Sequence, residues 1–182
     1  MRKIALHLLL VLLLSSSVQA KDVIFKLTGG YFLPAEQAFK DVYGSGLAWG
    51  GEAVVYVWTN VGFWLGGNYF GKKGRLTFTQ EETRVQVLPL GVGVKLRTSS
   101  ENPGLYSGFG LRYNSFKESN PIGALSKGGL GIVIAMGGVI TILRGVVLDL
   151  SVEYSYCKMK PADFTINIGG LSVGLSLGYK LK

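Results

Sequence analysis

The chain contains one cysteine and one histidine in 182 residues, and this scarcity excludes several kinds of protein. A single thiol, Cys157, cannot form an intrachain disulfide, so the fold must be stable without one. The histidine, His7, lies in an apolar N-terminal segment. If that segment is removed, the remaining chain lacks the usual ligand sets of zinc and other transition metals. We therefore predict no metal site and no cofactor.

After the N-terminal segment, the sequence also lacks a run suited to a membrane-spanning helix. The uncharged run at residues 128–143 has sixteen residues, five of them glycine, whereas a spanning helix needs about 20 apolar residues. Apolar and small residues alternate along this run. A transmembrane helix is the alternative here, but the alternation favours a β-strand.

Proline is scarce and glycine abundant, with 5 and 27 residues respectively. This glycine content is roughly twice the average of about 7%. Disorder would require a low hydrophobic content, whereas 48% of the residues are hydrophobic. The composition therefore predicts a folded, glycine-rich β protein.

Residues 1–20 have the three parts of a secretory signal peptide. Two cations open the segment, an apolar run fills residues 4–14, and small residues surround a cleavage position at Ala20. We predict export and cleavage after Ala20, with an uncleaved anchor helix as the alternative. Residues 21–182 would then form one domain. Its formal charge would be +6 instead of +8, because the two cations are lost.

Eight segments of the remaining chain show the period-two alternation of β-strands. In the last of them, Leu171, Val173 and Leu175 share one face, and the residues between them are small or polar. The segments are 23–33, 47–58, 61 to as far as 79, 83–97, 104–116, 128–143, 146–157 and 170–181. In a soluble sandwich the apolar faces would form a core, and in a membrane barrel they would face lipid.

The connections between these segments alternate in length. Short turns are expected at residues 59–60 and 144–145, and an intermediate link at 98–103. Longer, more polar links are expected at 35–46, 71–82, 117–127 and 158–167. Short turns on one side and long loops on the other are typical of the periplasmic and outer sides of an outer-membrane barrel.

Aromatic residues favour the membrane barrel over a soluble sandwich or soluble barrel. They lie toward both ends of the apolar faces, where a membrane barrel carries aromatic girdles. The residues are Tyr31, Trp49, Tyr69, Tyr113, Tyr154 and Tyr156 on the long-loop side, with Trp58 and Tyr179 on the other. We therefore predict an all-β fold, a closed antiparallel eight-stranded transmembrane β-barrel in the outer membrane.

The mature chain resembles the eight-stranded outer-membrane barrels related to outer-membrane protein A and the opacity-type porins. The resemblance rests on residues 88–95 (LPLGVGVK), residues 105–112 (LYSGFGLR) and the Ser-, Glu- and Tyr-rich strand at 146–157. It implies insertion by the barrel-assembly machinery. The chain departs from these families at its end, where Tyr179 is followed by Lys-Leu-Lys and no terminal aromatic residue.

Some barrels of this size are enzymes that modify lipid A, and the resemblance makes such an enzyme one alternative. Those enzymes use a histidine beside a serine or an acidic residue. Residues 21–182 contain no histidine, so we predict that the protein is not an enzyme. A structural or surface-interaction role is the expected function.

Charged residues on the small-residue faces are expected to line the barrel interior. An eight-stranded barrel is just wide enough for side chains to fill it, so buried charges there must pair. The predicted ion network contains Lys26, Glu52, Lys95, Arg112, Asp149, Glu153 and Lys180. We expect the forked guanidinium of Arg112 to bridge Glu52 and Glu153. A plugged lumen follows from this pairing, with a narrow small-solute channel as the alternative.

The long links contain an excess of basic residues. A positive surface beside the membrane suits the phosphates of lipopolysaccharide, although an ordinary solvated loop surface is the alternative. The basic loop residues concerned are Lys72, Lys73, Arg75, Lys158 and Lys160. The expected partners are outer-membrane lipid and lipopolysaccharide. We expect no nucleic-acid partner and a monomeric protein.

Overall fold

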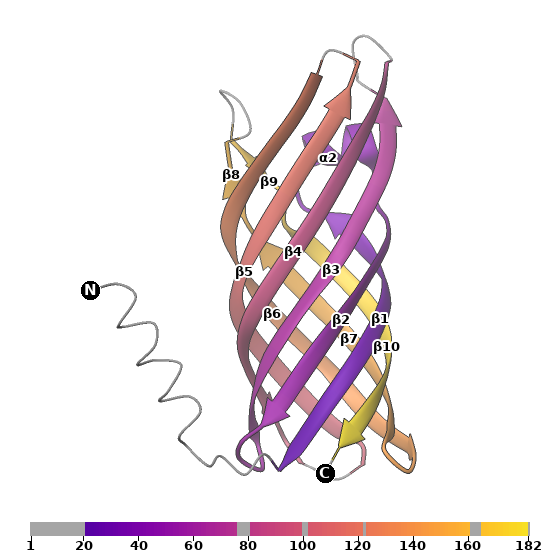
Figure 1. Ribbon diagram of the computed structural model, residues 1–182, viewed down its shortest axis with the longest axis vertical. Coiled ribbons are helices and arrows are strands. Elements are labelled where there is room, and N and C mark those ends of the chain that lie inside the picture. Colours follow the sequence, from indigo (N-terminus) through magenta and orange to yellow (C-terminus); the bar gives the residue numbers. More distant parts are fainter. Residues whose placement is uncertain (1–20, 76–80, 100–101, 122, 161–164, 182) are drawn as a thin grey trace, which may run out of the picture.

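The computed structural model describes residues 21–75, 81–99, 102–121, 123–160 and 165–181. The predicted signal peptide, residues 1–20, lies outside this part of the chain. The described residues form a closed barrel of eight antiparallel strands, shown in Figure 1, which confirms the predicted fold class.

The barrel strands follow one another around the wall in chain order, and β1 closes the barrel by pairing with both β2 and β10. The strands are β1 (Asp22–Pro34), β2 (Gly46–Tyr56), β3 (Val61–Arg75), β4 (Glu82–Arg97), β5 (Gly104–Asn120), β6 (Gly123–Leu143), β7 (Val146–Tyr156) and β10 (Gly170–Leu181). The helix α2 (Gln37–Tyr43) and the two-stranded sheet of β8 (Lys158–Met159) and β9 (Ile166–Asn167) lie in the longer links.

One end of the barrel, here called the turn end, carries the short connections, the start of β1 and the end of β10. Val23 is paired with Leu181 in the register, so the two ends of the described barrel are neighbours. Gly145 forms the tight β6–β7 turn at a φ of 83°, a left-handed conformation that favours glycine. The opposite end, here called the loop end, carries α2, β8 and β9 (Figure 1).

The exterior of the barrel is apolar around its circumference. Large side chains such as Leu27, Leu130 and Leu150 are exposed by 76%, 67% and 60%. A soluble monomer rarely exposes so extensive an apolar surface, whereas lipid tails cover it in a membrane. The eight aromatic residues predicted for the girdles are all exposed on this exterior. The outward and inward faces therefore agree with the predicted alternation.

Two strands on one side of the barrel are longer than predicted. Residues 117–120 and 123–127 of the expected loop continue β5 and β6, and β3 reaches Arg75, within its predicted extension to residue 79. Apolar outward residues end at the girdle, but the inward alternation of Val85, Val87 and Phe116 continues. The change to polar outward residues marks the end of the apolar band and not the end of the strands.

Residues 128–143 lie within β6, so the alternative of a transmembrane helix is wrong for this segment. In the described part of the chain, no helix has the length and apolarity needed to span a bilayer. The helix α2 and the sheet of β8 and β9 were not predicted. Both are short elements whose stability comes from packing at the loop end of the barrel.

Candidate functional site: the barrel lumen

Charged side chains fill the middle of the lumen. Lys26 and Glu52 face each other across β1 and β2, with Nζ and Oε1 2.7 Å apart. Lys26 also pairs with Asp149, and Lys95 pairs with Glu52. All four side chains are buried or nearly so. This central cluster therefore balances two cations with two carboxylates.

Tyr106 completes the central cluster and was missed by the sequence analysis. Its hydroxyl donates to Asp149 at 2.9 Å and 3.1 Å from the two carboxylate oxygens. The ammonium of Lys95 lies 4.3 Å from the centre of the same ring, which adds a cation–π contact. Tyr106 has the same strand parity as Gly108 and Arg112, so alternation places it on the lumen face.

Glycines on the neighbouring strands provide space for these long side chains. Gly178 is paired with Lys26, and a Cβ at Gly178 would lie 2.8 Å from Cγ of that lysine. A Cβ at Gly108 would lie 3.1 Å from Cγ of Lys95. A long charged side chain on one strand thus occupies the interior next to a glycine on the neighbouring strand, which has no side chain to compete for the same space.

Arg112 and Glu153 form a separate pair closer to the loop end. The guanidinium makes a forked contact with both carboxylate oxygens, with Nη2 2.8 Å from Oε2. The expected bridge from Arg112 to Glu52 is wrong, because Glu52 is held by Lys26 and Lys95 instead. The Nε atom of Arg112 is buried and has no hydrogen-bond partner among the described residues.

A third polar group lies at the turn end. Asp22 accepts from Arg97 at 2.6 Å and contacts Lys180 at 3.2 Å. The guanidinium of Arg97 lies 3.8 Å from the ring centre of Tyr56. Lys180 was predicted to line the lumen, but Asp22 and Arg97 were missed. Both follow the alternation of Lys26 and Lys95, so extending the same rule to the strand ends would have included them.

Small separate cavities remain between these layers. A cavity of about 70 Å³ lies between the central cluster and Arg112, and one of about 30 Å³ lies beyond Arg112. A third, also about 30 Å³, lies between Tyr106 and the turn end. Arg112 and Tyr106 each line the two cavities on either side of them. These side chains therefore divide the lumen.

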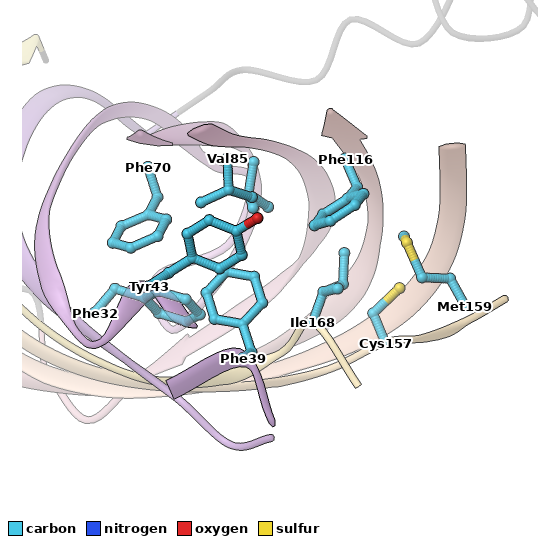
Figure 2. Packing of buried hydrophobic residues seen from close by; sticks show 10 residues of the cluster. Phe32, Phe39, Tyr43, Phe70, Val85, Phe116, Cys157, Met159 and Ile168 are labelled. Carbon is cyan, nitrogen blue, oxygen red and sulfur yellow. The ribbon is translucent and has the colours of Figure 1, made fainter. Parts of the chain in front are cut away.

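An apolar cluster, here called the apolar plug, lies at the loop end of the lumen. Figure 2 shows Phe39 and Tyr43 of α2 among side chains that project from the surrounding strands. The plug comprises Phe32, Phe39, Tyr43, Phe70, Val85, Val87, Phe116, Cys157, Met159 and Ile168. The rings of Phe39 and Tyr43 lie 5.0 Å apart, and those of Phe32 and Phe70 5.1 Å apart. The sequence analysis did not predict this plug.

Polar contacts hold α2 in the barrel mouth. The Tyr43 hydroxyl lies 3.0 Å from Oγ1 of buried Thr83, and burial raises the pKa of Tyr43 above its ordinary value. Lys72 donates to the carbonyl of Ser45, just after the helix. Glu36, at its start, accepts from the backbone N–H of Asn167 at 3.2 Å. The helix is therefore joined to three parts of the loop end.

The predicted basic loop residues do not form one surface. Lys72 points inward to Ser45, whereas Lys73 and Arg75 are exposed on the exterior of β3. Lys158 lies in β8, 5.7 Å from the ring centre of Tyr156, and Lys160 follows that strand. The first three residues belong to a strand and not to a loop, because β3 extends beyond the girdle.

Comparison with solved structures places this geometry in a known fold. OprG of Pseudomonas aeruginosa matches with a TM-score of 0.71 at 13% identity, over 89% of this chain and 96% of OprG. Ail of Yersinia pestis, in complex with the heparin analogue sucrose octasulfate, matches with a TM-score of 0.62 at 14% identity, over 88% and 98% of the two chains. The fold is that of the eight-stranded outer-membrane barrels.

A third solved barrel of this fold is Escherichia coli outer membrane protein W, with a TM-score of 0.56 and 18% identity over 89% of this chain and 98% of that protein. No protein-family model matches the sequence, and no curated protein matches it. The likeness therefore confirms the predicted barrel fold.

Proposed function

We propose that the protein is a non-conducting, non-enzymatic barrel of the outer membrane that acts through its surface. The observation that carries this proposal is that the central cluster, the Arg112–Glu153 pair and the apolar plug follow one another along the lumen. An ion entering from the loop end would meet the buried aromatic side chains of the apolar plug before it reached the Arg112–Glu153 pair. Desolvating an ion in such a region costs several kcal/mol or more.

The sequence supports a non-catalytic role in a different way. Residues 21–182 have no histidine, and the carboxylates of the lumen are engaged by cations. Among the described residues, no group of three histidine, cysteine or carboxylate side chains is placed to hold a metal ion. The lumen charges are thus better suited to structural pairing than to proton transfer with a substrate.

A projecting part of the barrel offers a surface for interaction. Strands β3 to β6 continue beyond the rest of the wall at the loop end. Pairing of β6 with β7 begins only at Ile132, and Met159 of β8 lies against Gly129, so within the described chain residues 123–128 of β6 have a partner strand, β5, on one side alone. An unpaired strand edge exposes backbone donors and acceptors that an extended peptide can pair with.

The opposite edge of this wall is protected. Gly74 of β3 has the inward parity of Lys72, and a Cβ there would meet the carbonyl oxygen of Val42, so α2 packs against the inner face of this strand. Lys72 and Lys73 add charge there, and charge is a common way to prevent edge pairing. The β6 edge contains only Lys127 among small and apolar residues. This difference in charge supports a surface-interaction role on the β6 side.

Single-channel recording in planar bilayers tests the proposal. The refolded protein is expected to give no steady conductance. The double variant Arg112→Ser, Glu153→Ser removes one layer and leaves the central cluster and apolar plug, so it should remain closed as well. Steady conductance from the unaltered protein would establish the narrow channel instead, and conductance from the double variant alone would show that the layers do not act in series.

A further inference from the structure

The exterior of β3, β4 and β5 carries a basic patch directly above the aromatic girdle. Tyr69, Leu88 and Tyr113 are exposed on the exterior, which sets the outward parity of their three strands. Closer to the loop end, four or more residues beyond these three, positions of the same outward parity hold four cations on the exterior. They are Lys73 and Arg75 of β3, Arg84 of β4 and Lys117 of β5, all exposed.

Strand register brings these side chains together. Lys73 is paired with Arg84, and Arg75 with Glu82. Lys117 is paired with Gln86, next to Arg84 along the outward face of β4. Glu82 contacts Lys73 at 2.7 Å. On this part of the described exterior, four cations therefore face a single carboxylate, and the patch has an excess of three positive charges.

A groove of about 230 Å³ lies at the lower margin of the patch. Tyr69, Gly71, Lys73, Arg84 and Gln86 contribute to its lining. A Cβ at Gly71 would lie only 2.5 Å from the Tyr69 hydroxyl, so glycine at this position lets the tyrosine ring fold over the strand. The groove thus gathers an ammonium, a guanidinium, a phenol and an amide, all of which can donate hydrogen bonds to an anion.

The position of the groove indicates which anion it meets. The groove adjoins the girdle, and girdle residues lie at the level of lipid headgroups. A guanidinium binds phosphate through two parallel hydrogen bonds, and a lysine adds a point charge. The Lys73–Glu82 pair is solvent-exposed, and such pairs contribute little, so an anion can displace it.

We propose that this basic patch binds the phosphate groups of lipopolysaccharide in the membrane leaflet that surrounds the loop end. The inference rests on the proposed outer-membrane location and is independent of whether the lumen conducts. It replaces the predicted set of five basic loop residues with the patch Lys73, Arg75, Arg84 and Lys117. Lys72 is excluded because it is used by Ser45, and Lys158 and Lys160 lie on a different part of the loop end.

Native mass spectrometry of the refolded protein in detergent, titrated with lipid A that carries both phosphates, tests this proposal. The double variant Lys73→Gln, Arg84→Gln should bind the lipid at least about tenfold more weakly, since each cation near an anionic lipid surface adds to the attraction. The matched control Lys158→Gln, Lys160→Gln removes the same charge from the same end and should bind like the unaltered protein. Heat-modifiability on gels confirms that both variants are folded.

Three outcomes would overturn the proposal. If the two double variants lost lipid A affinity equally, the binding would come from general electrostatic attraction between the loop end and the lipid. Equal binding of enzymatically dephosphorylated lipid A would show that the acyl chains alone are recognised. Equal binding of phosphatidylglycerol would show a preference for any anionic lipid. Lipid binding and planar-bilayer conductance are measured independently. Loss of the lipid-binding proposal would therefore not affect the proposal of a non-conducting lumen, and conductance through the lumen would not affect the lipid-binding proposal.

Discussion

Asp149→Asn is the substitution that most directly probes the central cluster. The side chain is fully buried, pairs with Lys26 and accepts from the Tyr106 hydroxyl. Asparagine has almost the same volume, so packing is preserved and one negative charge is lost. Lys26 and Lys95 would then share Glu52 alone. The cluster would change from neutral to a net charge of +1 in a poorly hydrated interior.

Breaking a buried ion pair by removing one partner costs about 3–5 kcal/mol. Because Lys26 keeps Glu52 at 2.7 Å, we expect the lower part of this range, about 3 kcal/mol of unfolding free energy. The double variant Asp149→Asn, Lys26→Met restores neutrality and should be destabilised less than the sum of the two single variants. Coupling of about 1–3 kcal/mol is typical of residues in one network.

Urea unfolding in phospholipid vesicles, followed by tryptophan fluorescence and by heat-modifiability, measures these free energies. The chain offers a matched control in Glu82→Gln, which removes a carboxylate from an exposed pair and should give no measurable change. The reasoning is refuted if Asp149→Asn is as stable as the unaltered protein and the coupling to Lys26 is zero. That result would indicate a hydrated lumen in which Asp149 needs no cation.

Three further substitutions or reactions test other parts of the structure. Leu175→Arg, on the lipid-facing side of β10, should cost about 2–4 kcal/mol near the bilayer midplane, and tolerance in vesicle unfolding would place that face in water. Phe39→Ala removes a buried ring of the apolar plug, a change that costs about 3–5 kcal/mol in a packed core. Limited proteolysis should therefore cut near α2 sooner, with bilayer conductance unchanged. Burial raises the pKa of the Cys157 thiol, so a maleimide should label it slowly until urea unfolds the barrel; fast labelling of folded protein would contradict its burial.

The strand faces could be predicted from the sequence because side chains alternate with a fixed period of two. That rule placed Lys26 and Asp149 in the lumen and Leu175 on the exterior without any long-range information. The lumen residues that the sequence analysis missed obey the same rule. Asp22, Arg97 and Tyr106 lie at or near strand ends, beyond the clearest alternation, yet they have the inward parity of their strands.

The partner of each charge could not be predicted in the same way. Counting along the strands gave Arg112 and Glu52 comparable depth, but depth in a barrel also depends on strand tilt and on the stagger summed across several pairs. In the structure Glu52 faces Lys26 on the adjacent strand, and Arg112 reaches Glu153 instead. The choice of partner for each charge therefore depends on the register of all the strands in the closed barrel and not on the sequence of any one strand.

The apolar plug was hidden for a different reason. The helix α2 has seven residues, too few for a helical periodicity to stand out in a polar link. Its one signal is the spacing of Phe39 and Tyr43, which are four residues apart and so share a helical face. Their burial depends on Phe70 and Val85 from other strands, so only the assembled barrel shows it.

Fractionation of cells expressing the chain with residues 1–20, combined with gel electrophoresis of unheated and boiled samples, tests the membrane barrel most directly. The protein is expected in the outer-membrane fraction, and the unheated sample should migrate faster than the boiled one, because a closed barrel stays compact in detergent. Recovery as a soluble periplasmic protein, with the same mobility before and after boiling, would contradict the transmembrane barrel.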